Sequence, residues 1–358
     1  MPELPEVESL RCSLLPFLIG SRVTRVTLNR PDIVGARGSR KLCTRLPPIA
    51  PESLLQGCTI TGLHRLGKHI AIRANHDGVL AHRDDLNSDR FLVVQLGMTG
   101  SLAIVHHRTQ LGEPIQPSQP TQPTQHVLHP EPLALHTHVR WWLTTSLNTS
   151  IELRFIDPRR FGSLHCCANQ AQLDTHWSKL GPDALDLQLN LNFNLDLPQS
   201  LVTQTTTSTS PIASPTTSPT TSPTTHENRT RVRASLAQSK RDVKSVLLDQ
   251  HVVAGVGNIY ADEALFAARI NPSRKACSLT DTEAYRLLDA IPTTLIAAIS
   301  LGGSTIRDYV NATGSKGQAQ ALHAVYGRAG LACVACSSTL AGCKLAQRAT
   351  VWCPACQR

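Results

Sequence analysis

The stretch KSVLLDQHVVAGVGNIYADEALFAARINP, residues 244–272, decides how the C-terminal half of this chain folds. Its two flanks have the apolar spacing of helices, whereas residues 255–258, Gly-Val-Gly-Asn, are too rich in glycine for a helix interior. Asn258 is a suitable N-cap for the second helix. A helix N-terminus offers free backbone N–H groups and a positive dipole end, so the segment predicts a phosphate site.

Downstream of this stretch, four cysteines form two closely spaced pairs. Cys333 and Cys336 are followed, after sixteen residues, by Cys353 and Cys356. Two thiolates on each tight knuckle complete a tetrahedral four-cysteine site that keeps no open position. The spacing therefore predicts one structural Zn²⁺ in a small ribbon. The other seven cysteines are scattered, which favours reduced thiols over a disulfide framework.

The charge of the chain is unevenly distributed. The 358 residues are enough for two domains and carry a formal net charge of +9. Residues 231–358 hold 15 Lys and Arg against 8 Asp and Glu, so +7 of that charge lies in the C-terminal third. A basic balance suits a polyanionic partner, although it is also compatible with a protein that is merely soluble.

The N-terminal half is predicted to begin with one helix and continue as strands. Apolar residues recur at helical spacing through Val7, Leu10, Leu14 and Phe17. From about residue 21 to 165, short β-rich runs are separated by turn residues, among them VTRVTL, HIAIR, FLVVQL, VRWWLTT and IELRFI. This pattern predicts an antiparallel sandwich or a flattened barrel.

Two insertions interrupt these patterns. Residues 106–136 are rich in Gln, Pro and His, and residues 199–230 contain SPTT three times in succession. Such compositions cannot build a core, so the second insertion predicts a linker; a recognition tail is the alternative. The predicted domains are therefore 1–184, a linker 185–232, a helical domain 233–326 and the ribbon 327–358.

The first eight residues, MPELPEVE, bring an amine and carboxylates together. Removal of Met1 would leave Pro2 with a free secondary amine, next to Glu3 and Glu6. An α-amino group has a pKa of about 7.7–8, so part of it is a neutral nucleophile near pH 7. The simpler interpretation is that Pro2 and Pro5 only start a helix.

Five segments resemble one family, in the same order along nearly the whole chain. They are MPELPEVE (1–8), LGMTGSL (96–102), DPRRFG (157–162), GVGNIYADEALF (255–266) and QRAT (347–350). The family is the formamidopyrimidine-DNA glycosylases (MutM/Fpg), bifunctional glycosylase/AP lyases that remove oxidised purines from DNA. The resemblance implies an α+β fold: an N-terminal antiparallel β-sandwich with flanking helices, a helix–two-turns–helix domain and a Cys₄ zinc ribbon.

The resemblance also implies roles for individual residues. Pro2 would be the nucleophile of a Schiff base, with Glu3 and Lys68 also catalytic, and Lys68 and Arg348 would be proton donors for β,δ-elimination. The implied DNA-binding residues are His138, Arg159, Lys240, Asn258 and Arg348. The implied wedge, which fills the space of an extruded base, is Met98, Arg159 and Phe161. For Lys68 the alternative is an ordinary surface lysine, and for Met98 and Phe161 it is a place in the core. Glu263 would lie in the site or serve a structural hydrogen bond.

The predicted protein is a base-excision repair enzyme that acts on damaged double-stranded DNA. The alternatives are an endonuclease VIII-like glycosylase for oxidised pyrimidines, a non-catalytic damage sensor on the same scaffold, and a zinc-ribbon RNA- or protein-binding module. Gln95 and GSKGQAQ (314–320) depart from the family pattern and leave the lesion preference open. No apolar run approaches the ~20 residues of a membrane span, and the N-terminus is unlike a signal peptide. We expect a monomer in the bacterial cytoplasm, associated with the nucleoid and without a membrane partner.

Overall fold

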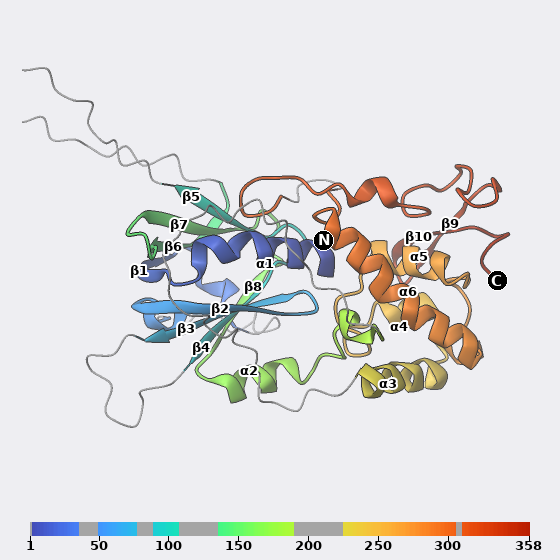
Figure 1. Ribbon diagram of the computed structural model, residues 1–358, viewed down its shortest axis with the longest axis horizontal. Coiled ribbons are helices and arrows are strands. Elements are labelled where there is room, and N and C mark those ends of the chain that lie inside the picture. The colour runs from blue at the N-terminus through green and yellow to red at the C-terminus, as the bar shows by residue number, and fades with distance from the viewer. Residues whose placement is uncertain (1, 36–48, 77–88, 107–134, 190–224, 306–309) are drawn as a thin grey trace, which may run out of the picture. The chain divides into compact units, whose positions relative to one another are not determined.

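The computed structural model describes residues 2–35, 49–76, 89–106, 135–189, 225–305 and 310–358, which form two compact units (Figure 1). Unit 1 comprises Met1–Gly181, Ala254–Gly257 and Leu295–His323, and unit 2 comprises Pro182–Val253, Asn258–Thr294 and Ala324–Arg358. The units are therefore interleaved in sequence, unlike the consecutive segments that we predicted. Most of the two insertions lies outside the described residues.

Unit 1 is built on one antiparallel sheet of eight strands in the order β5-β7-β6-β1-β2-β3-β4-β8. The strands are β1 (Arg22–Leu28), β2 (Cys58–Leu66), β3 (His69–His76), β4 (Arg90–Gln95), β5 (Ser101–His106), β6 (Thr137–Thr144), β7 (Ser150–Ile156) and β8 (Ser163–Cys167). The five β-rich runs quoted from the sequence coincide with β1, β3, β4, β6 and β7, of which β4 and β6 end one residue before the run does.

The sheet divides into two four-stranded layers, β5-β7-β6-β1 and β2-β3-β4-β8. β1 and β2 share a single registered pair, Arg22 with Thr59, whereas β2 and β3 share eight. Helix α1 (Leu4–Leu18) lies beside both layers in Figure 1, and its Leu10 and Leu14 share one core with Ile72 of β3 and Trp141 of β6. The predicted antiparallel sandwich is confirmed. A short helix, α2 (Gln170–Trp177), packs on β4 and β8.

Unit 2 is mostly helical. It contains α3 (Thr225–Gln238), α4 (Val243–Leu247), α5 (Asn258–Ala267), the first part of α6 (Asp281–Ser300) and the hairpin of β9 (Ala341–Leu345) and β10 (Arg348–Trp352). The stretch that opened the sequence analysis forms helix, connection and helix, as predicted. The first helix begins at Thr225, inside the predicted linker. Among the described residues, no helix combines the length and the apolar character needed to cross a bilayer.

Candidate active site and metal centre

The N-terminus of α1 is fixed by its own carboxylates. The Glu3 backbone N–H donates to Glu6 Oε2 at 2.8 Å, and the Glu3 side chain accepts from the Glu6 backbone, which together form a capping box. Both side chains are 2% exposed, and Pro2 is buried beside them. The prolines do start a helix, and the same helix start places Pro2 and Glu3 at one defined point of unit 1.

The glycines of the Gly255-Val256-Gly257 segment are explained by close contact with this helix start. A Cβ on Gly257 would lie 2.2 Å from Glu3 Cδ, and one on Gly255 would lie 2.4 Å from Leu4 Cδ1. The Leu4 backbone N–H also donates to Gly255 O at 3.2 Å. The segment therefore lies directly against the Glu3 carboxylate, at an approach that only glycine allows.

Lys68 reaches the same segment from the turn between β2 and β3. Its Nζ donates to Val256 O at 2.9 Å, and a Cβ on the preceding Gly67 would lie 2.8 Å from Ala254 Cβ. Lys68 is half-buried, so it is not an ordinary surface lysine. The structure thus brings the residues around Pro2, Glu3 and Lys68 to one short piece of backbone.

An ion-pair cluster around buried Glu8 supports the Lys68 turn. Arg65 donates to Glu8 Oε2 at 2.7 Å and to Gly67 O at 3.3 Å, and Arg11 donates to Glu8 Oε1 at 2.6 Å. Burial by itself would raise the pKa of Glu8, but the hydrogen bonds and charges of Arg11 and Arg65 lower it to about 2. Glu8 therefore stays ionised and ties α1 to the turn. No local pattern in the sequence indicates this cluster, because Glu8 and Arg65 are distant in the chain.

The proposed wedge residues lie on two loops that touch through their backbones. A Cβ on Gly97 would lie 2.4 Å from the Phe161 carbonyl carbon, which brings the Met98 turn against the DPRRFG loop. Met98 and Phe161 are half-buried, and Arg159 is exposed with its guanidinium carbon 5.1 Å from the centre of the Phe161 ring. Neither apolar residue belongs to the buried core, which supports the wedge over the core alternative.

Asp157 holds the DPRRFG loop through hydrogen bonds. It is fully buried and accepts from Thr99 Oγ1 at 2.6 Å and from the Gly162 backbone at 2.6 Å. His138 is 3% exposed, and its Nε2 lies 2.8 Å from Asp157 O. This buried ring therefore supports the loop that exposes Arg159; that His138 also contacts DNA stays a prediction.

Glu6 also holds a segment that the sequence analysis did not connect with the N-terminus. Its Oε1 accepts the Ser304 backbone N–H at 2.7 Å, although the two residues are 298 positions apart. A Cβ on Gly303, whose φ is +79°, would lie 2.9 Å from the same oxygen. Ser304 pairs with Gln318 of GSKGQAQ in an isolated bridge, so the base of this loop belongs to the N-terminal site of unit 1.

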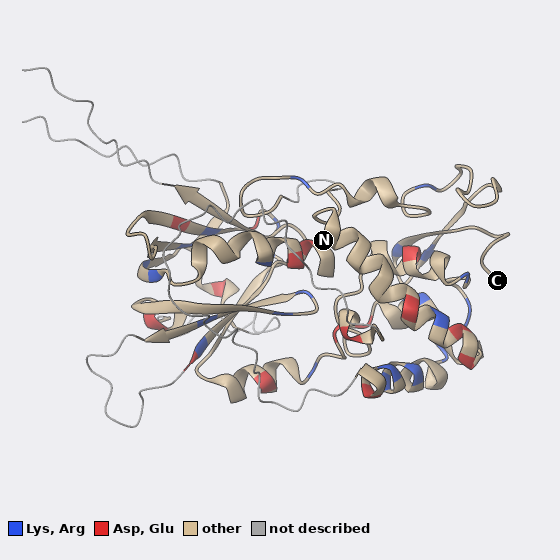
Figure 2. Cartoon of the chain, viewed as in Figure 1, with Lys and Arg blue, Asp and Glu red and all other residues tan. Residues whose placement is uncertain are grey.

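The residues proposed to contact DNA from unit 2 are placed differently. Lys240 and Arg348 are exposed, Lys240 after α3 and Arg348 at the start of β10. Figure 2 marks further basic residues along α3, whose sequence contains Arg229, Arg231 and Arg233; of these, Arg229 is buried and paired with Asp289. Asn258 begins α5, but its Nδ2 donates to Ala349 O at 3.0 Å and its Oδ1 accepts no hydrogen bond from any described residue. Asn258 therefore does not cap the helix through its side chain.

Glu263 has a structural role. Its Oε1 accepts the backbone N–H groups of Val325 and Tyr326 at 3.0 and 2.8 Å, and its Oε2 accepts that of Ala324 at 2.9 Å. The side chain is 8% exposed. Of the two roles left open by the sequence, the structure supports the hydrogen-bonding one.

The four predicted metal ligands converge. The Sγ atoms of Cys333, Cys336, Cys353 and Cys356 all lie within 4.8 Å of one another. Backbone N–H groups of Ala335 and Cys356 point at the Sγ atoms of Cys333 and Cys353, each at 3.4 Å, as expected for metal-binding knuckles. The donor set fits a tetrahedral metal ion, and among the described residues no other group of His, Cys, Asp and Glu does so.

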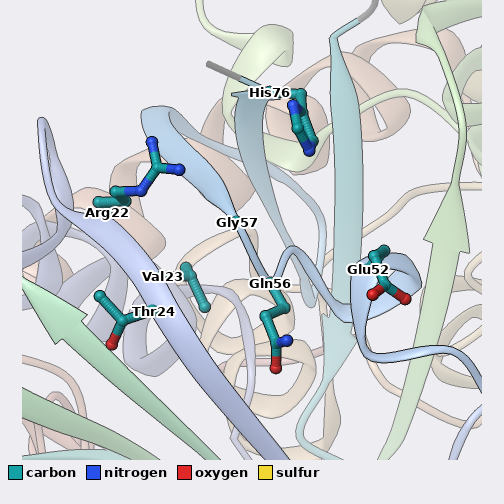
Figure 3. Close-up of a pocket in the computed structure, with 7 residues that line it drawn as sticks. All are labelled: Arg22, Val23, Thr24, Glu52, Gln56, Gly57 and His76. Carbon is teal, nitrogen blue, oxygen red and sulfur yellow. The ribbon is translucent and has the colours of Figure 1, made fainter. Parts of the chain in front are cut away.

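An open pocket of about 420 Å³ lies elsewhere in unit 1 (Figure 3). It is lined by Arg22, Val23, Thr24, Glu52, Gln56, Gly57 and His76. None of the residues proposed for chemistry or DNA contact lines it, so the candidate site is defined by the contacts above.

Known proteins resemble this chain over its full length. The family model described as the formamidopyrimidine-DNA glycosylase N-terminal domain matches residues 1–164, and that of the corresponding H2TH domain matches residues 219–310. A formamidopyrimidine-DNA glycosylase of Xanthomonas campestris is 34% identical, and one of Geobacillus kaustophilus is 33% identical, each over 100% of both chains.

Solved structures agree with this result. The crystal structure of MutM (Fpg) from Thermus thermophilus matches with a TM-score of 0.65 and 30% identity, covering 99% of this chain and 98% of that one. The Lactococcus lactis Fpg in complex with DNA containing an abasic site matches with a TM-score of 0.67 and 25% identity, covering 100% of both chains. The fold is therefore that of the helix–two-turns–helix DNA glycosylases. The chain belongs to the formamidopyrimidine-DNA glycosylase family.

Proposed function

We propose that this chain excises oxidised purines, 8-oxoguanine and formamidopyrimidines, from duplex DNA and then cleaves the strand at the resulting abasic site. One observation carries the proposal: Glu3, next to Pro2, and Lys68 contact the same backbone segment, Val256-Gly257. A nucleophilic amine, a carboxylate and an ammonium group are the set that Schiff-base chemistry requires. The sensor and pyrimidine-specific alternatives are not favoured, because the family's N-terminal sequence is intact.

The proposed chemistry begins at Pro2. Its neutral nitrogen attacks C1′ of the damaged nucleotide, and the bond from C1′ to the base breaks with its electron pair, which the base takes up with a proton. Opening of the sugar ring gives an iminium ion. Loss of the C2′ proton and cleavage of the C3′–O bond form the β-elimination step. Loss of the C4′ proton and cleavage of the C5′–O bond form the δ-elimination step, and water then releases Pro2.

The neighbouring side chains are proposed to move the protons. The Glu3 carboxylate accepts and returns protons on the sugar. The Lys68 ammonium and the Arg348 guanidinium hydrogen-bond the phosphates that leave, and Lys68 donates a proton to them. Capping at Glu3 and Glu6 and the contact with Gly257 hold the Glu3 carboxylate at a fixed position.

The loops at Met98 and Phe161 are proposed as the wedge. A base must leave the stack before the enzyme can reach C1′, and extrusion costs a few kcal/mol. Met98 and Phe161 fill the space with apolar groups, while exposed Arg159 hydrogen-bonds the unpaired base on the opposite strand. Lys240, Asn258 and Arg348 bind backbone phosphates.

We propose Zn²⁺ as the metal of the four cysteines. Four thiolates and no open position are typical of structural zinc, which would hold the ribbon and take no part in bond cleavage. We further propose that the protein works as a monomer on damaged double-stranded DNA, in the bacterial cytoplasm where that DNA lies.

The proposal is tested with Glu3→Gln and single-turnover kinetics. Wild-type protein is expected to release 8-oxoguanine from an 8-oxoguanine·cytosine duplex and to nick the strand. Glu3→Gln is expected to lower the excision rate by about 10²–10⁴-fold, the usual range for a general acid–base group. Its Kd for a duplex with an uncleavable abasic analogue should change by less than about threefold. Wild-type protein that binds the lesion but neither excises nor nicks would refute the proposal.

A further inference from the structure

A fully buried ion pair lies under the ribbon hairpin that carries Arg348. Lys244 of α4 and Asp262 of α5 are both 0% exposed, and Lys244 Nζ lies 2.7 Å from Asp262 Oδ1. Burial raises the pKa of Asp262 to about 6, although the charge of Lys244 opposes this rise. Removing two charges from water is costly, and apolar replacements are often as stable, so stability alone is a weak explanation for such a pair.

The contacts of this pair point to the hairpin. Lys244 Nζ donates to Ala349 O at 3.0 Å and to Thr350 Oγ1 at 2.8 Å. Asp262 Oδ2 accepts the Val351 backbone N–H at 3.1 Å. Lys244 thus forms an ion pair with Asp262 and donates hydrogen bonds to Ala349 and Thr350. The pair is therefore hydrogen-bonded to three consecutive residues of β10, Ala349, Thr350 and Val351.

Arg348 is the residue immediately before those three. The hairpin turn consists of Ala346 and Gln347, with φ values of +46° and +60°, and Arg348 pairs with Leu345 across it. A two-residue turn of this type leaves the strands little freedom relative to each other. The direction in which exposed Arg348 points is therefore set by the attachment of β10.

We propose that Lys244 and Asp262 are positioning residues that act through Arg348, by fixing β10 so that the guanidinium meets a DNA phosphate. This inference rests on the proposed function, in which Arg348 contacts DNA. It assigns to the pair a role in DNA binding that neither side chain performs by direct contact, since both are enclosed in unit 2.

The test is a mutant cycle on DNA affinity and its salt dependence. Kd is measured for a duplex with an uncleavable abasic analogue, between 50 and 200 mM salt, for Arg348→Ala, for the apolar pair Lys244→Met/Asp262→Leu and for the triple variant. Arg348→Ala should weaken binding about tenfold and reduce the slope of log K against log salt by about 0.9, the value for one lost phosphate contact.

The apolar pair variant is expected to reproduce both changes, and the triple variant to be no weaker than Arg348→Ala. A merely structural role would lower the fraction of folded protein without changing the salt slope. The control is Lys275→Met/Asp242→Leu, which removes a pair of similar length, 2.9 Å, between an exposed Lys275 and a half-buried Asp242 in the same unit. It should leave Kd within about twofold.

Thr350→Val tests the proposal while keeping the buried ion pair of Lys244 and Asp262. It removes one acceptor of Lys244 and preserves shape, so binding should weaken about two- to threefold in the wild-type background and not at all in Arg348→Ala. Additive losses in either cycle, or an unchanged salt slope in the pair variant, would overturn the inference. If wild-type protein did not bind the abasic duplex more tightly than undamaged duplex, the proposed function itself would be refuted. Zinc content and melting temperature identify any variant that is not folded.

Discussion

The residues proposed for chemistry and those proposed for DNA contact are held in opposite ways. Pro2 and Glu3 are buried, and the backbone at Gly257 leaves no space for a methyl group. Arg159, Lys240 and Arg348 are exposed at loops and element ends. Bond cleavage requires placement within a fraction of an ångström, whereas attraction to a polyanion acts over several ångströms and tolerates long side chains. Substitutions should therefore separate rate from affinity.

Apart from replacement of a catalytic residue itself, the largest effect is expected where the backbone touches Glu3. In Gly257→Ala, the new Cβ would lie 2.2 Å from Glu3 Cδ, so the carboxylate must move. We expect the excision rate to fall by about 10²-fold, because small displacements of a catalytic group cost this much. The Kd for an abasic-analogue duplex should change little.

Gly62→Ala is the matched control for this substitution. Like Gly257, Gly62 of β2 has no left-handed φ, but the nearest atom to an added Cβ is Nε2 of the exposed His64 ring at 3.1 Å, which can move. The variant adds the same methyl group away from Glu3, so its excision rate should stay within about threefold of wild type. Equal losses in the two variants would mean that the added methyl group, and not contact with Glu3, governs the rate.

A smaller effect, on affinity, is expected from removal of the metal. The four cysteines should bind one Zn²⁺ per chain, and a chelator or Cys353→Ser should release it. The hairpin that carries Arg348 loses one of its anchors, so Kd for the abasic duplex should rise about tenfold or more. The measurement is zinc content together with Kd, and full affinity in the metal-free protein would contradict this account of the ribbon.

The smallest effect concerns stability at low pH. His69, His165 and His176 lie together, with the rings of His165 and His176 stacked at 4.2 Å. Burial lowers the pKa of His69 to about 4 and lowers the pKa values of the other two. An unfolded histidine has a pKa of about 6.5. The contribution of these neutral histidines to the free energy of unfolding is therefore fully present above pH 6.5 and is lost as the pH falls toward 4.

At pH 5 the free energy of unfolding lost through His69 is about 2 kcal/mol. The check is the fall in melting temperature between pH 7.5 and 5, which should be smaller in His69→Phe than in wild type. His251→Phe, at an exposed position, is the control and should follow wild type. An identical fall in all three proteins would exclude the histidine cluster as a cause.

Local signals in the sequence were sufficient for much of the fold and for the metal centre. Strand runs such as FLVVQL alternate or stay apolar in the way that sheet packing requires, and the paired spacing of the cysteines defines their knuckles. The helix start at Pro2 to Glu6 was also visible, because capping involves residues close in sequence.

The parts that could not be predicted depend on contacts between distant residues. Two hydrogen bonds, from Ser304 N–H to Glu6 and from Lys244 to Thr350, join segments that no local sequence pattern relates. The burial of His138 could not be predicted, because a motif identifies a residue but not its environment, and Nε2 of this ring lies 2.8 Å from Asp157 O. The predicted helix boundary at 233 missed Thr225, because the Thr- and Ser-rich sequence just before it resembles a linker.

The central claim is that the amine of Pro2 is the nucleophile. Wild-type protein is incubated with an 8-oxoguanine·cytosine duplex and sodium borohydride, and the covalent protein–DNA adduct is digested and mapped by mass spectrometry. The account predicts one adduct, at the Pro2 nitrogen of chains that have lost Met1. An adduct at Lys68 or another amine, or no adduct from protein that has lost Met1 and excises the base, would contradict it.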